Sequence, residues 1–92
     1  MIINELYSTI LSRKTADPAT SYTARLFAAG EDEMVKKVGE EAIEVILAAK
    51  GQGNARLIEE TADLTYHVLV LLAAHHLSPA DIQTELDRRY RR

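Results

Sequence analysis

The chain has 92 residues, of which 47% are hydrophobic, and this predicts one globular domain over 1–92 and excludes wholesale disorder. Its formal net charge of −3 argues against a nucleic-acid-binding protein, and the lack of cysteine excludes disulfides, thiolate metal sites and cysteine nucleophiles. The sequence contains no recognisable signal peptide and no apolar stretch long enough to span a bilayer. We therefore expect a cytoplasmic protein without a membrane or nucleic-acid partner.

The N-terminal part of the chain is predicted to form a helix, a loop and a second, shorter helix. Apolar residues recur at steps of three and four over 2–13, the pattern of one helix face. An Asp-Pro pair marks 14–20 as a loop. The segment Ser-Tyr-Thr at 21–23 then opens a short helix, and Gly30 is expected to close it because a helix end often needs a positive φ.

Two long helices are predicted next, over 32–50 and 54–75, separated by the turn Gly-Gln-Gly at 51–53. The second half of the later helix is apolar on every side over 68–74. A helix of this kind must be surrounded by protein, which in so short a chain suggests a partner subunit. The buried stripe expected on the earlier helix comprises Val35, Val38, Ala42, Val45, Ile46 and Ala49.

The last helix is predicted to begin at Pro79. Ser78 stands at its N-cap and Asp81 at its third position, a variant of the capping box. No segment alternates with the period of a strand for long enough to form one, so we predict an all-α fold. The basic end of the chain, at 88–92, fits either a favourable helix terminus or a phosphate-binding segment.

Four acidic residues are predicted to face one another across the long hairpin. Glu41 and Glu44 are three residues apart, as are Glu60 and Asp63, and this spacing places each pair on one helix face. Glu44 and Glu60 both lie eight residues from Gln52, whereas Glu41 and Asp63 both lie eleven residues from it. Positions equidistant from the turn of an antiparallel hairpin lie at the same height.

Clustered carboxylates with no sulfur or imidazole partner suit Mg²⁺, with Mn²⁺ as a possible substitute. The alternative is that these acids form a solvated face. Lys37 lies four residues before Glu41 and fits either a surface ion pair or a contact with a phosphate. His67 lies four residues after Asp63 and fits either a hydrogen-bonded structural role or a substrate contact.

The acids also form a sequence motif, with Glu40, Glu41 and Glu44 on one predicted helix and Glu60 and Asp63 on the next. It resembles the metal motif of the MazG-like all-α nucleotide pyrophosphohydrolases. The resemblance implies a MazG-like helical bundle that is built on a long antiparallel hairpin and completed by dimerisation.

Other segments narrow the resemblance within that group. They are Ser-Tyr-Thr-Ala at 21–24, the following Gly30, Lys-Val-Gly-Glu-Glu-Ala at 37–42, Ala-Asp-Leu at 62–64 and Tyr-His at 66–67. Together they resemble the phosphoribosyl-ATP pyrophosphohydrolase family, and the likeness covers nearly the whole chain.

That resemblance implies Mg²⁺-dependent hydrolysis of phosphoribosyl-ATP to phosphoribosyl-AMP and pyrophosphate by a homodimer, the second step of histidine biosynthesis. In many organisms this activity is fused to the cyclohydrolase of the next step, but 92 residues leave no room for that domain, so we expect the stand-alone form. The expected metal ligands are Glu41, Glu44, Glu60 and Asp63. The expected catalytic residues are Glu40 and Glu41, with Glu40 as an outer base or a group that orients the attacking water. The expected substrate-binding residues are Ser21, Tyr22, Thr23, Lys37 and His67.

Two other functions remain open at this point. A house-cleaning pyrophosphohydrolase would use the same metal site on ordinary or damaged nucleoside triphosphates. A non-enzymatic helical interaction module would leave the acids as a solvated surface and would show no Mg²⁺-dependent thermal shift.

Overall fold

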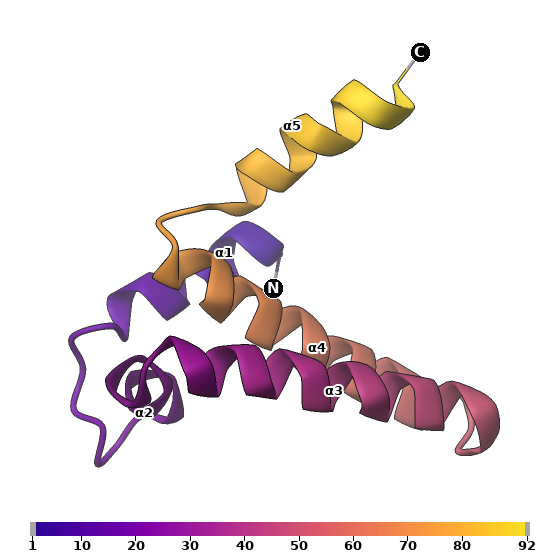
Figure 1. Ribbon diagram of the computed structural model, residues 1–92, viewed down its shortest axis with the longest axis horizontal. Coiled ribbons are helices and arrows are strands. Elements are labelled where there is room, and N and C mark those ends of the chain that lie inside the picture. The colour runs from indigo at the N-terminus through magenta and orange to yellow at the C-terminus, as the bar shows by residue number, and fades with distance from the viewer. Residues whose placement is uncertain (1, 92) are drawn as a thin grey trace.

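The computed structural model describes residues 2–91, which form five helices and no strand. Figure 1 shows α3 and α4 side by side as a long antiparallel hairpin, with α1 and α2 at the end far from its turn and α5 standing away from the body. The all-α prediction is confirmed. Within the same residues, no helix is both long enough and apolar enough to cross a membrane. The helices are α1 (Ile3–Ser12), α2 (Tyr22–Ala29), α3 (Glu31–Gly51), α4 (Asn54–Ala74) and α5 (Pro79–Tyr90).

Two glycines set the helix boundaries that shape the hairpin. Gly53 precedes α4 with φ 88° and ψ 166°, and Gly30 stands between α2 and α3 with φ 101° and ψ 177°. This backbone region is almost closed to residues with a Cβ. Gly30 therefore ends α2 as predicted, and it also starts α3 directly, one residue earlier than expected.

The hydrophobic core lies at the end of the hairpin far from its turn. There the second half of α4 packs among α1, α2 and the start of α3. Part of the apolar circumference of α4 is thus covered within one chain, by α3 above all and also by α1. The core side chains are Ile10, Leu26, Met34, Leu69, Val70 and Ala73.

The buried face of α3 differs from the predicted stripe. Val35, Ile46 and Ala49 are exposed, whereas Met34 and Ala48 are buried. Adjacent helical residues point about 100° apart, so the packed face is rotated by one residue from the expectation at both ends. The middle of the predicted stripe, Val38, Ala42 and Val45, is partly buried, so the sequence pattern located the packed face there and missed it at the two ends.

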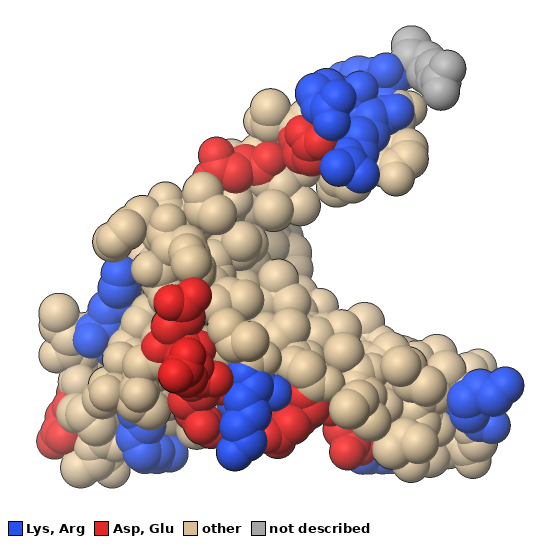
Figure 2. Space-filling model, viewed as in Figure 1, with Lys and Arg blue, Asp and Glu red and all other residues tan. Residues whose placement is uncertain are grey.

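The last helix is attached to the body by its first turn. The capping box is present, with the Ser78 backbone N–H donating to Asp81 at 2.9 Å. Among its described residues no side chain is buried, and α5 touches mainly α1. Figure 2 shows positive side chains gathered at its free end. Arg88, Arg89 and Arg91 form ion pairs with acids of α5 itself, as a helix terminus would, and Arg92 lies outside the described residues.

Candidate active site

Three of the predicted metal ligands converge between the long helices. Glu41 of α3 and Glu60 and Asp63 of α4 each offer an oxygen, and these oxygens all lie within 4.8 Å of one another. Glu60 is buried, Glu41 is partly buried and Asp63 is exposed, so the group opens to solvent on one side. An oxygen-only donor set of this kind fits a hard divalent cation such as Mg²⁺ or Mn²⁺.

The fourth predicted ligand, Glu44, does not belong to this close group among the described residues. Equal distance from the turn fixes the height of a residue along the hairpin but leaves its direction open. A three-residue step along a helix moves a side chain about 4.5 Å along the axis and rotates it by about 60°. Glu44 is therefore offset from Glu41 toward the turn, and its metal role stays a prediction.

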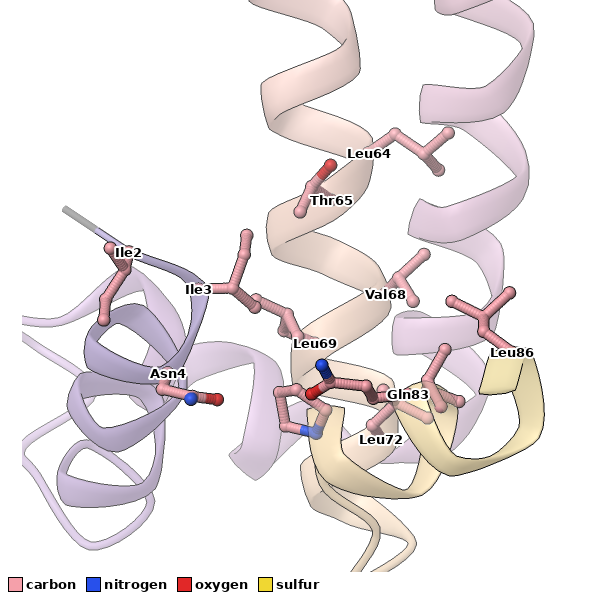
Figure 3. Close-up of a pocket in the computed structure, with 12 residues that line it drawn as sticks. Ile2, Ile3, Asn4, Leu64, Thr65, Val68, Leu69, Leu72, Gln83 and Leu86 are labelled. Atoms are coloured by element: carbon pink, nitrogen blue, oxygen red, sulfur yellow. The ribbon is translucent and has the colours of Figure 1, made fainter. Parts of the chain in front are cut away.

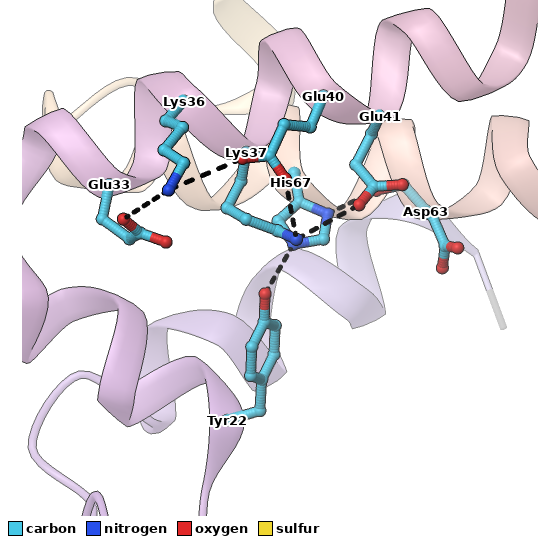
Figure 4. Close-up of polar contacts among 8 residues, drawn as sticks. All are labelled: Tyr22, Glu33, Lys36, Lys37, Glu40, Glu41, Asp63 and His67. Carbon is cyan, nitrogen blue, oxygen red and sulfur yellow. Dashed lines mark hydrogen bonds and ion pairs between the residues drawn. The ribbon is translucent and has the colours of Figure 1, made fainter.

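Positive side chains flank the acid group on both helices. On α3, the Lys37 ammonium lies 3.4 Å from a Glu41 oxygen and 3.8 Å from Glu40. Glu40 itself points outward and also pairs with Lys36 at 3.8 Å (Figure 4). The predicted base thus lies beside the site and outside the three-acid group.

On α4, Arg56 forms ion pairs with Glu60 and, at 2.7 Å, with Glu59. Arg56 is the site residue that the sequence reasoning missed. Its signal was present, because Arg56 precedes Glu60 by four residues just as Lys37 precedes Glu41, and residues four apart on a helix are neighbours.

Lys37 is held in its charged form. Burial alone lowers the pKa of Lys37, but the negative charges of Tyr22 when ionised and of Glu41 and Glu40, with the hydrogen bond to Glu41, together raise it above the usual 10.5. At neutral pH the side chain is therefore a fixed cation beside the acid group.

His67 joins α4 to the start of α2. Its Nδ1 lies 2.8 Å from the backbone oxygen of Asp63, which can only accept, so Nδ1 carries the proton. Its Nε2 then accepts from the Tyr22 hydroxyl at 3.0 Å. Both ring nitrogens of the buried imidazole are satisfied, which favours the structural role over direct contact with a ligand.

The other residues of the predicted substrate segment are also placed by hydrogen bonds. Ser21 caps α2 by accepting from the Ala24 backbone N–H at 3.1 Å. The Thr23 hydroxyl bonds to that of Tyr66, and burial raises the pKa of Tyr66 above its usual value. The Tyr22 and Tyr66 rings stack with centroids 6.2 Å apart. The start of α2 therefore presents a fixed, partly aromatic wall close to the acids.

Comparison with known proteins agrees with this arrangement. The profile of the family described as phosphoribosyl-ATP pyrophosphohydrolase matches residues 3–90. The phosphoribosyl-ATP pyrophosphatase of Pelotomaculum thermopropionicum is 56% identical over 88 residues, which cover 96% of this chain and 90% of that protein. The one from Trichlorobacter lovleyi is 55% identical over 89 residues, which cover 97% of this chain and 82% of that protein.

A third relative, the phosphoribosyl-ATP pyrophosphatase of Geobacter sulfurreducens, is 52% identical over 89 residues, which cover 97% of this chain and 82% of its own length. The matched family profile and these three relatives all span nearly the whole of this chain. The chain belongs to the phosphoribosyl-ATP pyrophosphohydrolase family.

Proposed function

We propose that this protein hydrolyses phosphoribosyl-ATP to phosphoribosyl-AMP and pyrophosphate in histidine biosynthesis, at the site formed by Glu41, Glu60 and Asp63. The observation that carries the proposal is the convergence of these three acids from two helices in a member of this family. A triphosphate chain needs compensating positive charge, which a hard cation on the acids and the neighbouring Lys37 together provide.

The metal in this proposal is Mg²⁺, which Mn²⁺ could replace. Glu41, Glu60 and Asp63 are its ligands, and Glu44, which lies nearer the hairpin turn, is proposed as a fourth. When bound, the ion supplies positive charge against the phosphate oxygens and promotes ionisation of the attacking water. The burial of Glu60 and the partial burial of Glu41 reduce the screening of their negative charge by solvent.

Around the acids, we assign one role to each polar neighbour. Lys37 is charged, lies at the site and points its ammonium toward Glu41, so it contacts the substrate phosphates. Glu40 is exposed at the edge of the site, next to Lys37, where a carboxylate can take a proton from water. Glu40 and Glu41 are thus the proposed catalytic pair.

The start of α2 forms the proposed pocket for the rest of the substrate. The partly exposed Tyr22 ring offers a flat apolar surface, which suits stacking against a base. Ser21 and Thr23 fix this segment through the helix cap and the bond to Tyr66. His67 takes part by holding the Tyr22 hydroxyl in place.

A second copy of the chain completes the fold in this proposal. An apolar groove of about 700 Å³ lies where α1, α4 and α5 meet, and Figure 3 shows the side chains that line it. Ile43, Ile46 and Ile58 are also exposed on the hairpin. Apolar surface of this extent on a small protein is typical of a subunit interface. We extend the proposal to a homodimer acting in the cytoplasm, where a nucleotide hydrolase of biosynthesis meets its substrate.

The experiment that tests the proposed function is a substrate comparison. Pyrophosphate release is measured with phosphoribosyl-ATP, dUTP and dCTP, each with Mg²⁺ and with EDTA. We expect fast release from phosphoribosyl-ATP alone, and only with Mg²⁺. Release from dUTP or dCTP but not from phosphoribosyl-ATP would contradict the substrate and favour nucleotide house-cleaning.

A further inference from the structure

The same arrangement of charges occurs twice, once on each helix of the hairpin. Lys37 of α3 pairs with the glutamates three and four residues later, Glu40 and Glu41. On α4, Arg56 pairs with Glu59 and Glu60 at the same two spacings. The sequence Lys-x-x-Glu-Glu is thus matched by Arg-x-x-Glu-Glu across the hairpin.

In both units, the two glutamates differ sharply in exposure. The Glu41 side chain is 13% exposed against 48% for Glu40. The Glu60 side chain is 7% exposed against 59% for Glu59. Each cation therefore bridges one inward carboxylate of the three-acid group and one outward carboxylate in solvent.

In this geometry each cation has two glutamate partners, one buried next to other acids and one exposed to solvent. Inward carboxylates lie close together with little solvent, so their mutual repulsion needs a counter-charge. A divalent ion arriving among them provides that charge and repels a nearby guanidinium or ammonium. The outward glutamate, lying on the adjacent turn of the same helix, can retain the cation once the inward one is taken.

Arg56 is placed to make this exchange. Its side chain is 46% exposed, so its movement is not opposed by close packing. Arg56 pairs with two glutamates of its own helix, so leaving Glu60 does not detach it from α4. The pair with Glu59 at 2.7 Å already has the geometry of a good ion pair.

We propose that Arg56 is an exchangeable counter-ion of the metal site, which occupies Glu60 in competition with the metal and is kept beside the site by Glu59. Lys37 stands in the equivalent position to Glu41 and Glu40. The proposal rests on the proposed metal site and adds a determinant of its affinity. It predicts that the arginine lowers metal affinity, whereas an arginine that orients Glu60 as a ligand would raise it.

The test is a titration with Mn²⁺ alone, in which electron paramagnetic resonance measures the free ion without any substrate. For Arg56→Gln we expect the Mn²⁺ Kd to fall by about three- to tenfold, the size of one partly exposed ion pair. The matched control is Arg88→Gln, which removes an exposed pair with a glutamate three residues away on α5. It should leave the Kd unchanged.

Thermal unfolding gives an independent readout of the same exchange. Without metal, Arg56→Gln should melt below the wild type because Glu60 loses its counter-charge, and the rise in Tm on adding Mn²⁺ should be larger than in the wild type. Arg56→Lys keeps the charge and should bind Mn²⁺ within about twofold of the wild type. This second variant keeps the proposal testable if Arg56→Gln fails to fold. A shift of the Mn²⁺ Kd as large as tenfold in Arg56→Lys would contradict the exchange of charge.

An unchanged or higher Mn²⁺ Kd in folded Arg56→Gln would overturn the counter-ion role while leaving the metal site in place. Absence of Mn²⁺ binding by the wild type would instead overturn the metal site itself, and the inference with it. The two failures are therefore distinguishable in one set of titrations.

Discussion

Lys37 shows how a single side chain is fixed by its neighbours. It is partly buried, its ammonium lies 3.4 Å from Glu41, and its pKa is raised despite the opposing effect of burial. The adjacent Lys36 is well exposed and pairs with Glu33 and Glu40 in solvent. Two neighbouring lysines on one helix thus differ mainly in whether they face the acid group.

This contrast provides a matched pair of variants. We predict that Lys37→Ala lowers kcat/KM for phosphoribosyl-ATP by about ten- to a hundredfold at saturating Mg²⁺, the range for loss of a charge-assisted phosphate contact. Lys36→Ala should stay within about twofold of the wild type because an exposed ion pair contributes little. Steady-state kinetics measure both variants. Equal kcat/KM values for the two would contradict the phosphate contact and show that Lys37 only forms a surface ion pair.

At this scale, residue spacing predicted that acids of the two long helices come together, but it did not predict which of the four belong to the close group. The three-residue steps placed Glu41, Glu60 and Asp63 together correctly because helical periodicity is a local property. The position of Glu44 depends on the rotation of α3 about its axis, which packing decides. Arg56 was recognisable from the four-residue rule but was passed over because no acid motif includes it.

The α3–α4 hairpin owes its sharp turn to a backbone conformation that glycine alone accepts readily. Helix boundaries were predicted to within a residue or so because glycines and caps act locally, as at Gly53 and Ser78. The packed face of α3 was predicted less well. Val35 and Ile46 are as apolar as the buried Met34, so hydrophobicity could not select among the faces.

The turn can be tested by comparing two glycines. Gly53→Ala should lower the free energy of unfolding by about 1–3 kcal/mol, since φ 88° is strained for alanine. Gly39→Ala should raise it by about 0.5–1 kcal/mol, because Gly39 is helical and an added Cβ there meets nothing within 4 Å. Urea denaturation of both variants measures these differences. A Gly53→Ala variant as stable as the wild type would show that the turn is not constrained in this way.

At the scale of the whole molecule, the chain leaves much apolar surface uncovered. The groove beside α5 borders the core, with Leu69 belonging to both, and further isoleucines are exposed along the hairpin. The sequence indicated such an excess through the apolar second half of α4. It could not indicate where the excess lies, because that depends on which faces the five helices bury within one chain.

We therefore predict a particle of twice the chain mass of 10.3 kDa in size-exclusion chromatography with light scattering. Leu86 lines the groove, and Leu86→Asp should shift the protein toward the monomer because it places a charge on apolar surface. Thr84→Asp, on an exposed position of the same helix outside the groove lining, should leave the mass unchanged. A monomeric wild type at micromolar concentration would refute the dimer.

The central claim is that the three-acid group drives hydrolysis of phosphoribosyl-ATP, and one measurement tests it most directly. Pyrophosphate release is compared at saturating Mg²⁺ for the wild type, Glu41→Gln and Glu33→Gln. Both glutamates belong to α3, but Glu33 is paired with the exposed Lys36, away from the three-acid group. Loss of a metal ligand should slow release by at least about a hundredfold, with Glu33→Gln near the wild type. Full activity in a folded Glu41→Gln variant would contradict the account.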